Sequence, residues 1–275
     1  MAGRKLRVDA LLVERGLFES RARAAAAVMA GEVRLGRGGA LVEKPGQAVA
    51  ADAELAVADA PRYASRGGVK LANALAESGL EVAGRRALDV GASTGGFTDC
   101  LLLAGAAHVI ALDVAYGQLD WRVREDPRVT VIERTNARAL SSALLPYAPE
   151  LIVVDVSFIS LRTVLPAVLA CAAARFDALA LVKPQFEAGR EAVGKGGVVR
   201  APAARIAALV AVGEWALGAG IAVLGYWSSG LPGPKGNRET FIQLAEGARD
   251  GALAAGELER RATQADAPSQ EAGGA

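Results

Sequence analysis

From Arg86 onward, short apolar segments alternate with longer segments of helical pattern. This alternation constrains the fold strongly, because strands separated by helices pair in parallel and place the helices on the faces of the sheet. It predicts a doubly wound α/β sheet. The first five strands are expected at residues 87–90, 108–114, 129–133, 151–155 and 178–183.

Two more strands are expected at residues 221–227 and 240–244, on either side of a segment rich in Gly and Pro at 228–238. So short a connection joins the two strands as a hairpin, so the last strand is expected to run antiparallel. A Rossmann-like sheet of seven strands with such a hairpin is typical of methyltransferases, whereas a dehydrogenase sheet more often ends on a parallel strand.

The composition narrows the class of protein. The chain has 275 residues, of which 52% are hydrophobic, which suffices for one large core and a smaller domain. No stretch reaches the ~18 uninterrupted apolar residues of a spanning helix, and residues 1–8 do not lead into a signal peptide. Cys100 and Cys171 form no C-x-x-C pattern or Cys/His cluster, so we expect no disulfide and no metal. These features predict a cytoplasmic protein without stable membrane association.

The first sixty residues follow another pattern. Helices are expected at 9–15 and 21–30, the second capped by Ser20, and strands at 32–35 and 54–57. Residues 1–37 carry eight Lys and Arg against four Asp and Glu, although the whole chain has a net charge of only +1. The expected organisation is a small α+β module at 1–60, a linker at 61–65, the larger domain at 66–247, and a low-complexity tail at 248–275 that is disordered at least from about 268.

The run LRVDALL at residues 6–12, with Ser20-Arg21 and the GEV sequence at 31–33, resembles the S4 RNA-binding domain. The resemblance implies that basic side chains contact RNA phosphates, which positions the RNA without reading its sequence and makes affinity fall with salt. The alternative is that these charges only solvate a helix face. The RNA-binding candidates of this module are Arg4, Lys5, Arg7, Arg21 and Arg23.

A glycine-rich segment, DVGASTGGFT at residues 89–98, follows the first strand of the sheet. Its glycines permit positive φ and let a ligand lie against the backbone, and the spacing G-x-x-x-G-G is similar to an S-adenosylmethionine loop rather than the dinucleotide G-x-G-x-x-G. An acid at the end of the second strand can accept hydrogen bonds from ribose hydroxyls, which NAD would satisfy equally well. The residue after the third strand is expected near the adenine. The cofactor-binding candidates are Asp89, Gly91, Ala92, Ser93, Thr94, Gly95, Gly96, Phe97, Asp113, Asn136 and Asp155.

Four polar residues are expected to converge at one edge of the sheet. Asp155 and Lys183 end the fourth and fifth strands, Glu239 precedes the last strand, and Lys70 lies ahead of the first. Ligands of open α/β sheets bind at the carboxyl ends of the strands. These four residues and the glycine-rich segment resemble the FtsJ-like ribose 2′-O-methyltransferases with their Lys-Asp-Lys-Glu tetrad.

With the S4-like module and the sequence YASRGGVKL at residues 63–71, the resemblance narrows to the TlyA family of hemolysin-named rRNA methyltransferases. It implies S-adenosylmethionine-dependent methylation of a cytidine 2′-hydroxyl in 16S rRNA, 23S rRNA or both, with ribosomal subunits as the partner. Lys183 is then the candidate to orient the hydroxyl and accept its proton, while Asp155 and Glu239 hold the lysines. Arg62 and Arg66 become further RNA-binding candidates.

Two alternatives stand beside this hypothesis. A hemolysin-type membrane-active protein requires a spanning or strongly amphipathic membrane segment, and the sequence shows none. A noncatalytic ribosome-binding module is expected to have lost a tetrad or cofactor-loop residue, and all are present.

Several residues outside the tetrad also indicate structural or binding roles. His108, the only histidine, is expected to be structural. Phe158 and Phe186 are candidates to stack on a flipped base. The glycines at 194–197 indicate either a mobile basic loop facing RNA or a solvated loop, with Lys195, Arg200 and Arg205 as its charges.

Overall fold

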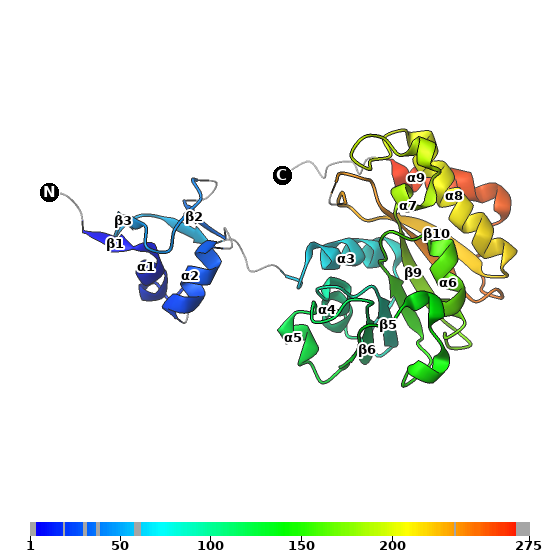
Figure 1. The fold of residues 1–275 in the computed structure, drawn as a ribbon, viewed down its shortest axis with the longest axis horizontal. Helices are drawn as coiled ribbons and strands as arrows, with labels where there is room; N and C mark the ends of the chain where they lie inside the picture. Colours follow the sequence, from blue (N-terminus) through cyan, green and yellow to red (C-terminus); the bar gives the residue numbers. More distant parts are fainter. Residues whose placement is uncertain are drawn as a thin grey trace. The chain divides into compact units, whose positions relative to one another are not determined.

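The structure is a computed structural model that describes residues 4–18, 20–29, 32–36, 39–57, 62–233 and 235–267. The chain divides into two compact units, Met1–Arg62 and Tyr63–Ala275 (Figure 1). The division falls within the linker proposed at 61–65, of which Pro61 lies outside the described residues. Each unit is described separately below.

The first unit combines two helices with two short antiparallel strand pairs. Helices α1 (Val8–Glu14) and α2 (Arg21–Met29) pack on each other around buried Leu12 and Val28. Ser20 caps α2 by accepting a hydrogen bond from the Arg23 amide at 3.3 Å. Strand β1 (Lys5–Arg7) pairs with β3 (Ala48–Ala50), and β2 (Val33–Leu35) pairs with β4 (Leu55–Val57). Strands β1 and β3 were not predicted, because β1 carries a charged residue at each end and β3 consists mostly of alanine, which is depleted in strands.

The second unit contains a seven-stranded sheet in the order β10-β11-β9-β8-β5-β6-β7. Strands β5 to β9 are parallel, β11 is antiparallel to β9, and β10 is antiparallel to β11. The predicted seven-stranded α/β sheet with a terminal hairpin is therefore confirmed. The strands are β5 (Arg86–Val90), β6 (His108–Leu112), β7 (Val129–Ile132), β8 (Leu151–Val154), β9 (Asp177–Val182), β10 (Ala222–Ser228) and β11 (Thr240–Ala245).

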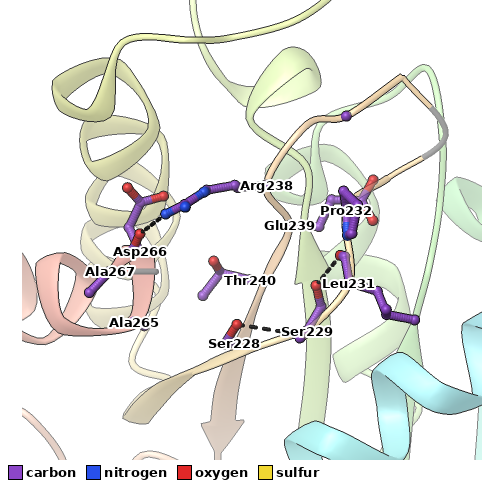
Figure 2. Close-up of a pocket in the computed structure, with 12 residues that line it drawn as sticks. Ser228, Ser229, Leu231, Pro232, Arg238, Glu239, Thr240, Ala265, Asp266 and Ala267 are labelled. Carbon is purple, nitrogen blue, oxygen red and sulfur yellow. Dashed lines mark hydrogen bonds between the residues drawn. The ribbon is translucent and has the colours of Figure 1, made fainter. Parts of the chain in front are cut away.

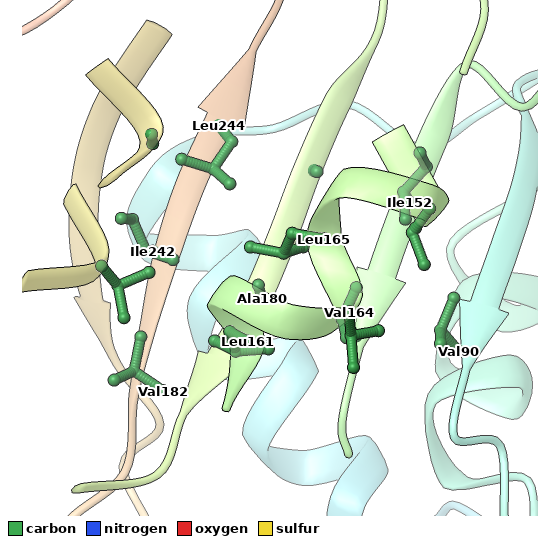
Figure 3. Close-up of a cluster of buried hydrophobic side chains, with 14 of the residues drawn as sticks. Val90, Ile152, Leu161, Val164, Leu165, Ala180, Val182, Ile242 and Leu244 are labelled. Carbon is green, nitrogen blue, oxygen red and sulfur yellow. The ribbon is translucent and has the colours of Figure 1, made fainter. Parts of the chain in front are cut away.

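Helices cover both faces of this sheet, so each face has its own apolar core. Leu161, Val164 and Leu165 of α6 pack over Ile152 and Ala180 on one face (Figure 3). On the other face, α3 and α4 pack on the sheet. The helices are α3 (Arg66–Ser78), α4 (Gly96–Leu103), α5 (Trp121–Arg124), α6 (Leu161–Leu169), α7 (Pro184–Glu187), α8 (Pro202–Gly218) and α9 (Leu258–Asp266); 3₁₀ turns lie at Ala137–Ala139, Ser142–Leu144, Arg190–Ala192 and Ala255–Glu257.

The segment after residue 247 is not the low-complexity tail that was expected. It contains α9, whose Leu258 and Ala262 are fully buried in the core with α8. Asp266 at the end of α9 accepts hydrogen bonds from both Nε and Nη2 of Arg205, at 2.8 and 2.7 Å. Arg205 is therefore a buried residue of α8, and its assignment to a mobile basic loop was wrong. Residues 268–275, the part expected to be disordered, lie outside the described residues.

Within the part of the chain that the structure describes, no helix combines the length and the apolar character needed to cross a membrane.

Candidate active site

Two of the four predicted tetrad residues meet across neighbouring parallel strands. Asp155 follows β8 and Lys183 follows β9, and β8 pairs directly with β9. Lys183 Nζ lies 2.5 Å from Asp155 Oδ1 and donates a hydrogen bond to Ser157 Oγ at 2.9 Å. The amine is thus held by one ion pair and one hydrogen bond, both to residues of the loop after β8.

The other two tetrad residues form a buried ion pair. Lys70 of α3 donates to Glu239 Oε2, just before β11. Both side chains are buried, and Glu239 Oε1 is buried without a hydrogen-bond partner among the described residues. Lys70 and Asp155 line the same cavity of about 380 Å³, so the two pairs border one site.

The glycine-rich segment forms the turn from β5 into α4. Gly91 and Gly95 have φ of +87° and +92°, which only glycine adopts easily. A β-carbon on Gly91 would overlap the carbonyl oxygen of Asp155, so this backbone lies directly against the loop that carries the tetrad carboxylate. The cavity with Lys70 and Asp155 is also lined by Gly91, Ala92, Ser93, Thr94, Gly96 and Phe97.

Asp113 connects the glycine-rich turn to the loop after β6. Its carboxylate accepts hydrogen bonds from the amides of Ser93 and Ala115, both at 2.7 Å. Asn136 accepts from the Arg138 amide at 3.0 Å and so caps the 3₁₀ turn after β7. Asp113, Asn136 and Asp155 line a second cavity of about 580 Å³ that shares Gly91 and Ser93 with the first.

Asp89 lies beneath the turn and is completely buried. Thr98 Oγ1 donates to Asp89 Oδ2 at 2.7 Å, while Oδ1 has no hydrogen-bond partner among the described residues. The pKa of Asp89 is raised to about 7, chiefly by burial, with the Thr98 hydrogen bond opposing the shift and the neighbouring carboxylates of Asp155 and Asp113 adding to it.

Comparison with known proteins places this arrangement in a family. Residues 63–246 match the FtsJ-like methyltransferases. The 16S/23S rRNA (cytidine-2′-O)-methyltransferase TlyA of Mycobacterium tuberculosis is 51% identical over 243 residues, which cover 88% of this chain and 90% of that protein. The chain is a member of the TlyA family of FtsJ-like methyltransferases.

Two further proteins are similar to this chain, one in sequence and one in both sequence and structure. Hemolysin A of Brachyspira hyodysenteriae is 39% identical over 196 residues, covering 71% of this chain and 81% of that protein. A solved structure from Streptococcus thermophilus is 39% identical, covers 96% of each chain and superimposes with a TM-score of 0.72. These two proteins therefore match 71% and 96% of the chain, respectively.

The cofactor of this methyltransferase family is S-adenosylmethionine, and the residues present fit it. The cavity beside Asp113 and Asn136 offers carboxylate and amide oxygens for a nucleoside, since each carboxylate oxygen has a second lone pair. Gly91 lines both this cavity and the cavity with Lys70 and Asp155. The groups that would hold the cofactor thus lie next to the tetrad.

Sequence reasoning missed two residues that organise the tetrad loops. Ser157, which binds Lys183, lies in a loop without a regular pattern. Glu187 of α7 is buried, and its carboxylate accepts hydrogen bonds from the Ser160 hydroxyl and the Leu161 amide, both at 2.6 Å. It thereby caps α6 and ties the loop after β8 to the turn after β9. Its position shortly after Lys183 in the sequence was the signal that could have indicated a role at this site.

A third cavity, of about 310 Å³, lies on the other side of Glu239 and was not predicted (Figure 2). Its wall includes Ser228 and Thr240, and the end of α9 closes it. Arg238 Nη1 donates to the Asp266 carbonyl at 2.6 Å, so the residue next to Glu239 is anchored to the C-terminal helix (Figure 2).

The RNA-binding candidates are exposed, but they differ in their contacts. In the first unit, Arg7 and Arg21 both bind the carboxylate of Asp9, at 2.8 and 3.1 Å. In the second, Arg66 Nη2 donates to the Pro232 carbonyl at 3.2 Å at the edge of the tetrad cavity. Four further candidates have exposed side chains: Arg4, Lys5, Arg23 and Arg62.

His108 Nε2 forms a hydrogen bond with Thr130 Oγ1 at 2.9 Å, and its ring meets the Tyr147 ring edge-on. These contacts link β6 to β7 and give the His108 side chain a structural role that requires no bound ligand. Among the described residues, no group of three or more His, Cys, Asp and Glu is arranged to hold a metal ion.

Proposed function

We propose that this protein transfers a methyl group from S-adenosylmethionine to the 2′-hydroxyl of a cytidine in rRNA, in 16S, 23S or both, with cytoplasmic ribosomal subunits as the substrate. The family relation supports the reaction, because the TlyA relative from Mycobacterium tuberculosis carries that activity in its name. The single observation that carries it in this chain is the pair of Lys–carboxylate contacts, Lys183–Asp155 and Lys70–Glu239, beside the glycine-rich turn.

The chemistry assigns different tasks to the two lysines. A ribose hydroxyl is a weak acid and a weak nucleophile, so it must be oriented and must lose its proton as the O–C bond forms. Bound S-adenosylmethionine supplies an electrophilic methyl group. Acting as the neutral amine, Lys183 donates an N–H to Ser157 Oγ, and its nitrogen lone pair accepts the hydroxyl proton; the ammonium ion so formed is paired with the neighbouring Asp155 carboxylate. Lys70, held by Glu239, supplies positive charge that stabilises the developing alkoxide.

Phe158 is proposed to stack on the target base. Its side chain is 92% exposed although it lies three residues after Asp155. Its φ of +65° is costly for an aromatic residue, and such strain is concentrated at functional sites. The Phe158 and Phe186 rings lie 5.4 Å apart, so the exposed ring has a packed neighbour on the Lys183 side. A cytidine turned out of its stack gains an aromatic surface there.

We further propose that the first unit binds rRNA through phosphate contacts of Arg4, Lys5, Arg7, Arg21 and Arg23, with Arg62 and Arg66 extending the contact. The support is the exposure of these side chains and the concentration of basic charge in residues 1–37. Such contacts depend strongly on salt.

The test uses purified full-length protein, methyl-labelled S-adenosylmethionine, and 30S and 50S subunits from a strain that lacks this methylation. We expect label in the rRNA of at least one subunit, at a cytidine 2′-oxygen identified by nuclease digestion and mass spectrometry. Lys183→Ala should abolish transfer while cofactor binding, measured by calorimetry, persists. Absence of label in both subunits would overturn the proposed function, and full activity of Lys183→Ala would overturn the role of Lys183.

A further inference from the structure

A buried acid of the first unit binds two of its exposed arginines. Asp9, in the first turn of α1, accepts hydrogen bonds from Arg7 Nε at 3.0 Å and Arg7 Nη2 at 2.8 Å. Its Oδ2 atom also accepts one from Arg21 Nη2 at 3.1 Å. The Asp9 side chain is 7% exposed, whereas those of Arg7 and Arg21 are 56% and 58% exposed. One carboxylate thus joins two exposed guanidinium groups.

This contact holds the two arginine side chains in place and leaves some of their N–H donors available for another partner. Asp9 is ionised throughout the physiological range, because the Arg7 hydrogen bonds, aided by Arg21, lower its pKa to about 2. Arg7 Nη1 and the remaining donors of Arg21 have no hydrogen-bond partner among the residues that the structure describes. A free arginine side chain loses rotamer entropy when it is immobilised, and a preformed contact removes much of that cost at binding.

Arg7 is held from a second side by the turn before β3. A β-carbon added to Gly46 would lie 3.1 Å from Arg7 Nη1 and 3.2 Å from Nη2, closer than carbon and nitrogen normally approach. The guanidinium therefore packs against a backbone position without a side chain. Gly46 does not have a positive φ, so its conformation is open to alanine.

We propose that Asp9 is a positioning residue that preorganises Arg7 and Arg21 as one clamp for an RNA phosphate. The inference rests on the proposed RNA-binding function of the first unit and deepens it. The clamp predicts a change in RNA affinity opposite to the change expected from net charge. If net charge alone governed RNA affinity, removing this acid would strengthen binding; if Asp9 orients the two arginines, removing it weakens binding although the protein becomes more positive.

The experiment measures binding of full-length Asp9→Asn to purified 30S and 50S subunits across a salt series. Asp52→Asn is the matched control, because Asp52 is an exposed acid of the same unit and loses the same charge. We expect Asp9→Asn to bind about tenfold more weakly, the effect of roughly one charged hydrogen bond, and with a shallower salt dependence. Asp52→Asn should bind as tightly as the native protein or slightly more tightly. Equal or tighter binding by Asp9→Asn overturns the inference.

Gly46→Ala separates positioning from folding and from charge. Its β-carbon forces the Arg7 guanidinium to shift by a few tenths of an ångström while every charge is kept, so it should weaken binding in the same direction but by less than Asp9→Asn. Thermal unfolding of the first unit is followed for both variants. If Asp9→Asn proves unfolded, the Gly46→Ala variant tests the proposal in its place. Native affinity of this variant for the subunits, with its Arg7 side chain shifted, overturns the clamp.

Failure of the clamp is distinguishable from failure of the RNA-binding proposal. Arg7→Gln and Arg21→Gln remove the contacts themselves. If these variants weaken subunit binding but Asp9→Asn does not, RNA binding by the unit stands and the positioning role fails. If neither arginine variant changes affinity or its salt dependence, the RNA-binding surface itself is misplaced.

Discussion

Lys183 Nζ lies 2.5 Å from Asp155 Oδ1, in a contact made possible by the direct parallel pairing of β8 and β9. Each residue is the first beyond its strand, so the sheet itself sets their separation. Ser157 completes the arrangement from the loop after β8, where its hydroxyl oxygen accepts a hydrogen bond from the same amine at 2.9 Å. The orientation of Lys183 therefore depends both on the paired strands β8 and β9 and on the loop after β8.

Ser157→Ala tests the contribution of that loop contact. Losing one hydrogen bond to a charged group costs about 1.5–3 kcal/mol, so we expect the single-turnover methylation rate to fall by roughly ten- to a hundredfold. Cofactor affinity should not change, because Lys183 remains paired with Asp155. Ser157→Thr keeps the hydroxyl and should restore most of the rate. An unchanged rate in Ser157→Ala would show that Asp155 alone orients Lys183.

Gly91→Ala tests the close approach of the glycine-rich turn to the tetrad loop. Gly84→Ala is the matched control, because Gly84 has a similar φ of +74° but no atom within 4 Å of its β-carbon position. The left-handed conformation costs an alanine roughly 1–2 kcal/mol at either site. Gly91→Ala adds a clash with the Asp155 carbonyl, so it should unfold at clearly lower denaturant concentration and lose cofactor binding. Equal midpoints for the two variants would contradict the packing described here.

The elements of the sheet and the tetrad pairs were predictable because strong local patterns determine them. The apolar runs before Asp155 and Lys183 mark buried strands, and parallel strands end at one edge. Ser157 was not predictable, since its position depends on a loop in which Phe158 adopts a positive φ. The nearness of Glu187 to Lys183 in the sequence was a signal for its role, but its buried contact with Ser160 and Leu161 depends on where the start of α6 lies in the fold.

The C-terminal region shows a different limit of sequence reasoning. Helix α9 has mostly polar residues, and only Leu258 and Ala262 mark its fully buried side, so its pattern resembles a solvated tail. Arg205 was assigned to a basic loop because glycines precede it. Pro202, the first residue of α8, was the available signal that a helix begins there, since proline is favoured at this position.

Leu258→Ala tests whether α9 belongs to the core of the second unit. Leu258 is fully buried against α8, and comparable leucine truncations cost about 2–5 kcal/mol. The free energy of unfolding, measured with urea, should fall by that amount. Gln264→Ala, on the exposed side of the same helix, should change it by less than about 0.5 kcal/mol. Equal stability of the two variants would mean that α9 is not docked in solution.

Asp89→Asn tests the charge state of the acid beneath the cofactor turn. The pKa of Asp89 is about 7 in the folded protein and 3.8 in its ordinary state, chiefly because of burial. Between these values the folded protein binds more protons than the unfolded chain, so stability contributed by Asp89 falls as pH rises from about 4 to 7 and then levels off. The lowered pKa values of Asp9 and Glu246, both about 2, act below this window.

The neutral amide removes this titration while it can still accept the hydrogen bond from Thr98. We therefore expect Asp89→Asn to gain stability over the native protein as pH rises, reaching ~2–4 kcal/mol at pH 8, with little or no gain at pH 4. Urea unfolding of the second unit at pH 4, 6 and 8 measures the difference. A constant offset between the two proteins across that range would show that Asp89 titrates at its ordinary pKa and that burial does not keep it protonated.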